Sequence, residues 1–483
     1  MAVCSFAKIP LRGTFTPRWP FATELYGRFF YIRSGEEQVL FCAFDSLNTW
    51  RNDTRRFRKE ISVSCGIPEK SIVFHELQAH AAPNSELMHE AMDGILARAI
   101  PAVKEMKENA VPFTCEVTEA YFGTDCSFNR EQYIEGIGGV TVWTGMGFDE
   151  QQRPCTDNEG IMLLRDYRPN IVKEPVYFDN PNDPLAYLFV FRGKNGEVLG
   201  TVSRFAAHPD VGVLFELRPV QGKAAMYHYD FDWPGYLSSK LEEDFGGISV
   251  YLNGPCGDLS TKKGYDGIDD FEASDAECRR LGLWFADKLE VSYGESKRVM
   301  ESADFLRTET FTLTLPMRDD MPRTLEEARN GQAAPAEEAR LAFEAAKADP
   351  TRTPAQVKLT IDDYYKALYN GSMATSICGF SDEELAKRET EVDIPCVRFG
   401  DYLFVGVPGE SLTETSTWLR SVCTGSKTIP LDQCNGYFSY MATPRTLTLG
   451  GYTYWCSWTT RETIPSMQKQ LYPLLRSFLE LSK

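Results

Sequence analysis

The stretch SIVFHELQAHAAPNSE, residues 71–86, joins a predicted β-strand to a predicted helix. Its first half is rich in β-branched and aromatic residues, which is typical of a buried strand. Two histidines follow, His75 and His80, with Gln78 between them. Histidine at a strand end is a common metal ligand, whereas the oxygen of glutamine is a weak ligand for zinc. Three interpretations are open: a metal site, a former metal site, or an ordinary strand end.

The spacing of these residues predicts which of them face the same way. Side chains alternate along a strand, so His75 and Gln78 should point to opposite faces, and Gln78 and His80 to the same face. His75 is therefore a poor substitute for Gln78 in any site. A β-bulge would break this argument.

Outward from this stretch, strand-like and helix-like segments alternate, which predicts an α/β fold. We expect one large domain over residues 1–483, with mixed β-sheets flanked by helices and no internal repeat. The predicted strands are 38–45, 71–77, 113–119, 139–144, 185–192, 198–206, 212–217, 246–254 and 309–317, and strand patterning resumes at 393–407. The predicted helices are 53–65, 85–108, 234–244, 269–290 and 463–482.

Residues 318–370 differ from the rest of the chain because they are rich in Ala, Glu, Arg and Lys. This composition predicts a helical excursion of two amphipathic helices with an exposed hinge. A solvated excursion is the simplest interpretation, and a lid or a partner surface is the alternative.

The overall composition excludes some classes of protein. The formal net charge is −18, and no Lys/Arg cluster marks a nucleic-acid-binding face. No apolar run approaches the ~20 residues of a membrane-spanning helix, and no secretory signal is recognisable. The thirteen cysteines include no CxxC pair, so we expect them to be reduced and mostly buried. We therefore expect a cytoplasmic protein without nucleic-acid or integral membrane contact; a homo-oligomer stays open.

Chemistry-bearing residues follow other predicted strands. His208 ends a strand in RFAAHPD (204–210), and two glycine-containing turns place Ser260 in YLNGPCGDLS (251–260) and Glu410 in FVGVPGESLTET (404–415). Glycine lets a backbone approach a ligand closely, and exposed amides can bind an oxyanion. Taken singly, each turn is equally typical of a tight strand–helix connection.

Taken together, six segments in this order resemble the catalytic domain of the neutral ceramidase (neutral/alkaline non-lysosomal ceramidase) family. They are LQAHAAP (77–83), FAAHP (205–209), DFDWPGY (230–236), NGPCGDLS (253–260), VPGES (407–411) and NGYFSYMAT (435–443). The resemblance implies an α/β zinc-dependent amidase that acts on a small-molecule substrate.

The resemblance also implies roles for individual residues. His208, Glu410 and Tyr440 match the family's zinc ligands, with Tyr437 as the other candidate for the tyrosine. Gln78 stands where the family has its remaining histidine ligand. The implied catalytic residues are Ser260, His80, Arg130 and Tyr452, and the implied substrate-binding residues are Gln78, Asp258 and Tyr437.

Gln78 leaves the mechanism open. The site holds zinc through His208, Glu410 and Tyr440 with His80 or water, or it holds a harder metal such as Mn²⁺ or Mg²⁺. Otherwise it works without metal, with Ser260 or Cys256 as the nucleophile. The first expectation is a metal-assisted hydrolase of a C–N amide bond. The alternatives are a metal-free hydrolase or lyase using Ser260 and His80, and a binding protein without catalysis.

Two further departures from the family bear on the substrate. Secreted ceramidases carry a C-terminal immunoglobulin-like domain and a signal peptide, and neither is recognisable in this chain. We therefore expect a soluble amide, or an ester, as the substrate.

Overall fold

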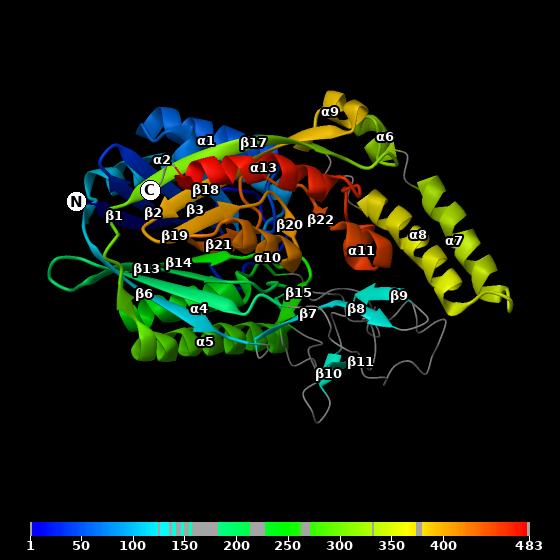
Figure 1. The fold of residues 1–483 in the computed structure, drawn as a ribbon, viewed down its shortest axis with the longest axis horizontal. Coiled ribbons are helices and arrows are strands. Elements are labelled where there is room, and N and C mark those ends of the chain that lie inside the picture. The colour runs from blue at the N-terminus through cyan, green and yellow to red at the C-terminus, as the bar shows by residue number, and fades with distance from the viewer. Residues whose placement is uncertain are drawn as a thin grey trace.

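The computed structural model describes residues 2–123, 126–134, 138–141, 146–148, 154–156, 182–212, 228–261, 271–330, 333–372 and 379–480 of the 483-residue chain. The prediction of mixed sheets flanked by helices is confirmed (Figure 1). Among the described residues, no helix is both long and apolar enough to cross a membrane.

Three larger sheets contain most of the strands. The first has the order β4-β3-β2-β1-β5, from β1 (Val3–Pro10), β2 (Tyr26–Ser34), β3 (Glu37–Phe44), β4 (Ile72–Glu76) and β5 (Val111–Pro112). The second has the order β14-β13-β12-β6-β16, from β6 (Thr114–Tyr121), β12 (Leu185–Arg192), β13 (Val198–Phe205), β14 (Ile248–Asn253) and β16 (Arg298–Val299). The third has the order β17-β18-β19-β21, from β17 (Leu306–Pro316), β18 (Glu389–Phe399), β19 (Tyr402–Gly406) and β21 (Lys427–Leu431).

Four two-stranded pairs complete the strands. They are β7 (Ser127–Asn129) with β15 (Leu259–Thr261), β8 (Glu131–Ile134) with β9 (Gly138–Thr141), β10 (Met146–Phe148) with β11 (Pro154–Thr156), and β20 (Glu410–Ser411) with β22 (Tyr440–Met441). The helices are α1 (Arg51–Cys65), α2 (Ser85–Glu108), α4 (Asp232–Phe245), α5 (Phe271–Ser296), α6 (Leu325–Asn330), α7 (Ala333–Ala348), α8 (Pro354–Ser372), α9 (Asp382–Lys387), α10 (Thr413–Val422), α11 (Pro444–Leu449), α12 (Tyr452–Trp455) and α13 (Thr463–Glu480).

Each large sheet contains the same unit, although the sequence shows no repeat. The unit is an antiparallel hairpin, a helix, and a last strand parallel to the second strand of the hairpin. The three units are β2-β3-α1-β4, β12-β13-α4-β14 and β18-β19-α10-β21. Because the two parallel strands of a unit end at the same edge, the loops that follow them lie close together, as at the binding edge of other α/β sheets.

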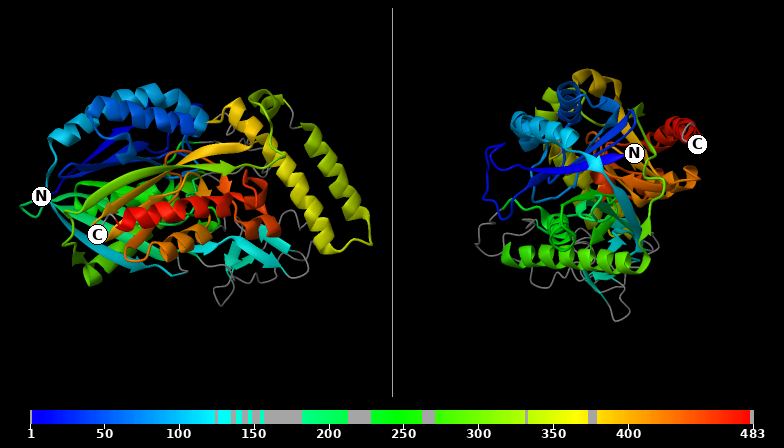
Figure 2. Two further views of the ribbon diagram at one scale, coloured as in Figure 1. Left: turned by 45° about the horizontal axis from the view of Figure 1, so that its top comes forward. Right: turned by 90° about the vertical axis from the view of Figure 1, so that its left-hand side faces the viewer.

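The inner faces of the three sheets share one core. Phe41 of the first sheet packs on Phe404 of the third, with 5.6 Å between ring centres, and Phe404 lies 5.8 Å from Phe189 of the second. Side chains alternate along these strands, so Phe41 faces this core while Leu40 packs on the helices outside. Viewed end-on, helices lie outside the sheets on three sides (Figure 2).

Residues 318–370 form a projecting arm, but it contains three described helices, α6, α7 and α8, rather than the two that we expected. Helix α8 packs on α12 through aromatic contacts: Tyr365 lies 5.0 Å from Trp455, and Tyr369 lies 5.3 Å from Tyr452, between ring centres. The arm is therefore attached at the side of the molecule that carries α12. Its role as a lid or partner surface stays a prediction.

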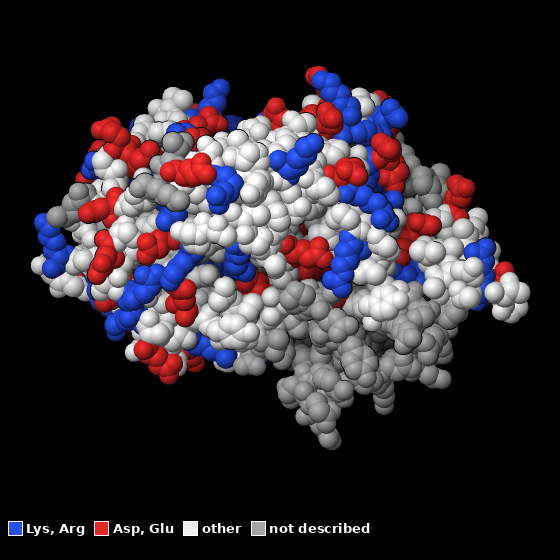
Figure 3. All heavy atoms as spheres, in the orientation of Figure 1, with Lys and Arg blue, Asp and Glu red and all other residues white. Residues whose placement is uncertain are grey.

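Several further expectations from the sequence can be compared with the structure. The eleven cysteines whose side chains are described are all buried, and none of them forms a disulfide, as predicted. The strand predicted at 212–217 lies outside the described residues apart from Gly212, and only the first part of 139–144 is described. On the face in Figure 3, acidic and basic side chains are interspersed over the described residues, and no basic patch covers that face.

Candidate functional site

The candidate site residues follow the ends of the parallel strands in the three units. Gln78 and His80 follow β4, His208 follows β13, and Glu410 comes shortly after β19. The small pairs β7–β15 and β20–β22 lie at the same end of the molecule, away from both chain termini (Figure 1). The repeated unit thus brings together residues that are more than 300 positions apart in the sequence, as the 332-residue separation of Gln78 and Glu410 illustrates.

Gln78 lies between His208 and Glu410. Its amide nitrogen is 3.2 Å from His208 Nε2 and donates a short hydrogen bond to Glu410 Oε2. Its Oε1 accepts a hydrogen bond from the thiol of Cys256, at 2.9 Å. Strand β4 ends at Glu76, and Gln78 has a left-handed backbone with φ of 64°. Gln78 and His80 therefore both reach His208 because of a turn and not because of strand alternation.

The hydrogen bonds of His208 define its tautomer. Its Nδ1 is 3.0 Å from the carbonyl oxygen of Cys256, and because a carbonyl only accepts, Nδ1 carries the proton. Burial, followed by the charges of Arg130 and His80, lowers the pKa of His208 well below its ordinary value, so the ring is neutral. Its Nε2 is then an acceptor, and His80 Nε2, at 3.0 Å, donates to it. His80 is half-buried, whereas His208 is fully buried.

Glu410 is a buried carboxylate surrounded by donors. Tyr437 donates to Glu410 Oε1 at 2.8 Å, Gln78 donates to Oε2, and the hydroxyl of Tyr440 is a further hydrogen-bond partner. Burial raises the pKa of Glu410, and these three hydrogen bonds and the charge of Arg130 oppose the rise. Burial, followed by the charge of Glu410, raises the pKa of Tyr440 well above its ordinary range, so Tyr440 keeps its proton.

Arg130 extends this network. Its Nη2 donates to the hydroxyl of Tyr440 at 2.9 Å and to the carbonyl of Gly257 at 2.7 Å. The guanidinium carbon also lies 5.6 Å from the ring centre of Tyr452, which packs edge-on against Tyr440. Tyr452 therefore packs against both Arg130 and Tyr440. Arg130, Tyr440, Glu410 and Tyr437 are thus connected in this order by hydrogen bonds.

Backbone strain is concentrated around this site. Four of the six described non-glycine residues with positive φ lie in the loops after β4 and β21: Gln78, Gln433, Asn435 and Ser439. Such conformations cost energy and are often retained where a functional geometry needs them. Gly409, with φ of 138°, precedes Glu410, and a Cβ there would lie only 2.6 Å from the carbonyl oxygen of Ser439. The PGE turn therefore requires glycine.

Two predicted residues have other surroundings. Asp258 accepts hydrogen bonds from the backbone and hydroxyl of Thr413 and from Asn129, so it connects the loop after β14 to the start of α10 and the end of β7. Ser260 is fully buried, and its hydroxyl has no hydrogen-bond partner among the described residues. A nucleophilic serine needs a base within hydrogen-bond reach, and no such contact supports this role for Ser260.

Two contacts that shape the site were not predicted from the sequence. Cys256 was considered only as a nucleophile or a buried thiol, whereas its thiol orients the amide of Gln78 and its carbonyl orients His208. Asp432 accepts backbone hydrogen bonds from Ser411 and Cys256, which fixes the loops that carry Glu410 and Cys256. Neither contact follows from residue type or spacing.

The residues at the implied zinc position do not fit a zinc ion. Zinc sites take lone pairs from three or four Cys, His, Asp or Glu side chains. Here Gln78 presents an amide N–H group, and the tyrosine hydroxyl is protonated and bound to Arg130. Within the described residues, no group of three or more His, Cys, Asp or Glu side chains could hold a metal ion. The predicted ligands His208, Glu410 and Tyr440 do lie together, but they are already connected by hydrogen bonds.

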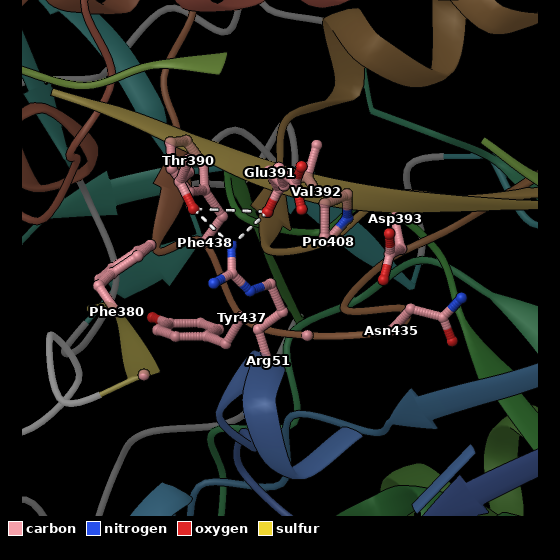
Figure 4. A pocket seen from close by; sticks show the side chains of 12 residues that line it. Arg51, Phe380, Thr390, Glu391, Val392, Asp393, Pro408, Asn435, Tyr437 and Phe438 are labelled. Atoms are coloured by element: carbon pink, nitrogen blue, oxygen red, sulfur yellow. Dashed lines mark hydrogen bonds between the residues drawn. The ribbon is translucent and has the colours of Figure 1, made fainter. Parts of the chain in front are cut away.

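Tyr437 also lines a separate pocket next to the site (Figure 4). The lining residues are Arg51, Gly379, Phe380, Thr390, Glu391, Val392, Asp393, Pro408, Asn435, Gly436, Tyr437 and Phe438. Arg51 donates to the Thr390 hydroxyl and to the Glu391 carbonyl, and it pairs with Glu384 at 2.6 Å. Glu384 thus neutralises the charge of Arg51. We place the candidate site at the cluster of Gln78, His80, His208 and Glu410 and not in this pocket.

Comparison with solved structures identifies the fold. The chain matches the crystal structure of neutral ceramidase from Pseudomonas aeruginosa with a TM-score of 0.62 and 14% sequence identity, over 98% of this chain and 73% of that chain. It also matches a structure of ceramidase complexed with C2, with a TM-score of 0.64 and 13% identity, over 99% of this chain and 75% of that chain. No protein-family model and no curated protein sequence matches the chain. The resemblance to neutral ceramidases is therefore confirmed at the level of the fold.

Proposed function

We propose that this chain is a ceramidase-like hydrolase that cleaves a C–N amide bond in a small soluble molecule. The observation that supports this proposal best is the His80–His208 pair. It holds a half-buried imidazole by a hydrogen bond to a buried, neutral one, next to a network of hydrogen-bond donors. A structural role does not require two histidines to meet in this way at the strand ends.

His80 is the group that moves protons in this proposal. Because His80 donates through Nε2 to His208, its Nδ1 is the basic nitrogen. That nitrogen takes a proton from the attacking water as the water oxygen bonds to the carbonyl carbon. The same proton then passes to the leaving nitrogen as the C–N bond breaks, which gives a carboxylic acid and a free amine. His208 positions His80 and does not itself exchange protons.

Arg130, a buried cation, stabilises the charge that develops on the carbonyl oxygen. Tyr440 is protonated; its oxygen accepts a hydrogen bond from Arg130 and its single proton is hydrogen-bonded to Glu410, so Tyr440 holds Arg130 in position. Donors that are fixed in a buried site cost no reorganisation when the oxyanion forms. Glu410 holds Tyr440 and Tyr437 in position.

The test uses fluorogenic N-acyl aminocoumarin amides with acyl chains of increasing length. We expect the protein to release free aminocoumarin, and His80→Ala to lower kcat/KM by about 10²–10⁴-fold, the usual contribution of a general acid–base group. His89→Ala is the matched control, because the side chain of His89 is 60% exposed and its Nδ1 lies 3.0 Å from Asp53 of α1. Full activity in His80→Ala would reject this mechanism. Binding without turnover across the amide series would favour a binding protein.

A further inference from the structure

The amide nitrogen of Gln78 occupies the space between His208 and Glu410. These two side chains approach to 3.8 Å, measured from His208 Nε2 to Glu410 Oε2. The nitrogen of Gln78 contacts both atoms: it donates to the carboxylate oxygen and shares the single lone pair of His208 Nε2 with the N–H of His80. These are the atoms that would bind a cation if one occupied this position.

The orientation of this amide is determined by its neighbours. Both His208 Nε2 and Glu410 Oε2 are acceptors, so the group that faces them must be the NH₂ group. On the other side, Oε1 of Gln78 accepts the Cys256 thiol proton at 2.9 Å. Turning the carbonyl oxygen toward Glu410 would place two acceptors together and would leave the thiol without its partner. The amide therefore presents donors, not a metal-ligating oxygen.

Both oxygens of Glu410 already accept a hydrogen bond. Its Oε1 accepts from Tyr437 and its Oε2 accepts from Gln78. Arg130, which donates to the hydroxyl of Tyr440, adds a fixed positive charge near the carboxylate. A second cation at this position would have to displace one hydrogen bond and would be repelled by the first.

We infer that the Gln78 amide replaces the metal ion in this site: it connects His208 to Glu410 by hydrogen bonds and keeps zinc out. The inference concerns the same site as the proposed hydrolase, but it rests on the hydrogen-bond geometry and not on the reaction. It predicts that an amide donor in place of one imidazole prevents zinc from binding at this site.

The test measures zinc binding without substrate. The full-length chain, purified without chelator or affinity metal, is dialysed against zinc chloride and analysed by mass spectrometry for metal content and by isothermal titration calorimetry. We expect no stoichiometric zinc in the wild type. Gln78→His should gain about one zinc ion per chain, because an imidazole there completes a ligand set with His208 and Glu410. Histidine tolerates positive φ better than most residues, so the backbone at this position can accept it.

Two control variants locate any gain in zinc binding. Gln78→Ala removes the amide without adding a ligand and should bind no zinc, and the double variant Gln78→His/His208→Ala should lose the gain. Circular dichroism and the Tm of each variant report whether it is folded, and the wild-type measurement does not depend on them.

Three results would overturn the inference. They are one tightly bound zinc in the wild type that His208→Ala removes, a folded Gln78→His variant without zinc, and equal zinc binding by Gln78→Ala and Gln78→His. Because no substrate is present, failure of the amide hydrolysis test would leave this inference standing. In the same way, zinc in the wild type would overturn this inference but would not decide whether the chain hydrolyses amides, which the aminocoumarin assay measures separately.

Discussion

His75 and His208 are both fully buried and both lie at the ends of strands, but their partners differ. His75, in β4, accepts a hydrogen bond from the backbone N–H of Asn253 at 2.9 Å and donates to the carbonyl of Asp432 at 2.8 Å. Since Asn253 ends β14 and Asp432 follows β21, His75 connects the three repeated units. His208 uses one nitrogen for a backbone carbonyl and turns the other toward the side chains of Gln78 and His80.

The difference shows that burial alone does not identify a functional histidine. Burial lowers the pKa of both rings: that of His75 falls to about 4, opposed only by its hydrogen bond to Asp432, and that of His208 is lowered further by the charges of Arg130 and His80. A histidine whose two nitrogens bind backbone atoms acts as a structural connection. A histidine that turns one nitrogen toward polar side chains can take part in chemistry.

The largest expected effect is on stability. His75→Ala leaves the Asn253 N–H without its partner and the Asp432 carbonyl with only the weak thiol donor of Cys434, and it opens a cavity, so we expect the free energy of unfolding to fall by about 4 kcal/mol. His208→Ala leaves neither the Cys256 carbonyl nor the Gln78 amide unpaired, because the carbonyl still accepts from the Leu259 N–H at 2.9 Å and the amide still bonds Glu410, so its loss should be about 2 kcal/mol. Urea unfolding followed by circular dichroism measures both variants. Equal losses would mean that His208 is as structural as His75.

The next effect is the pH dependence of stability. Folding lowers the pKa of His75 from 6.5 to about 4, so protonation favours the unfolded chain. The contribution of neutral His75 is complete above pH 6.5 and decreases as the pH falls from 6.5 to 4, by about 3 kcal/mol in total. His75→Gln offers a donor and an acceptor but does not titrate.

The comparison of His75→Gln with the wild type isolates this effect from other buried groups. Burial raises the pKa of Asp432 well above its ordinary value, which acts in the opposite direction in both proteins. We expect the stability of the wild type to fall more steeply than that of His75→Gln between pH 6.5 and 4, as measured by urea unfolding at several pH values. Parallel curves would show that His75 does not titrate in this range.

The sequence predicted most of the elements because their signals are local. The run at 185–192 and the strand β12 have the same bounds, and the apolar spacing of 85–108 matches α2. Helix α2 begins after Asn84, whose side chain accepts the N–H of Leu87, and this cap lies within the opening stretch. The packing of three sheets around one core was not predicted, because contacts such as Phe41 with Phe404 depend on residues that are far apart in the sequence.

The candidate site was predicted only in part. The sequence placed Gln78, His80, His208 and Glu410 in one cluster through the family resemblance, and the structure brings these four together. It did not predict which end of the Gln78 amide faces the cluster, because that depends on the thiol of Cys256, 178 positions away. The roles of Ser260 and Tyr452 stay predictions.

The smallest expected effect is a difference in stability between variants of two buried cysteines, Cys434 beside His75 and Cys256 beside Gln78 and His208. Cys434 Sγ lies 3.5 Å from His75 Nδ1, and Cys256 donates to Gln78. Alanine at either position leaves a small cavity that costs about 1 kcal/mol. Cys256→Ala also leaves the Gln78 carbonyl without a donor, which adds about 1 kcal/mol. Cys256→Ser should recover part of this second loss because its hydroxyl can donate. Equal Tm values for Cys256→Ala and Cys434→Ala would mean that the thiol does not hold the amide, and that another contact must set the orientation of Gln78.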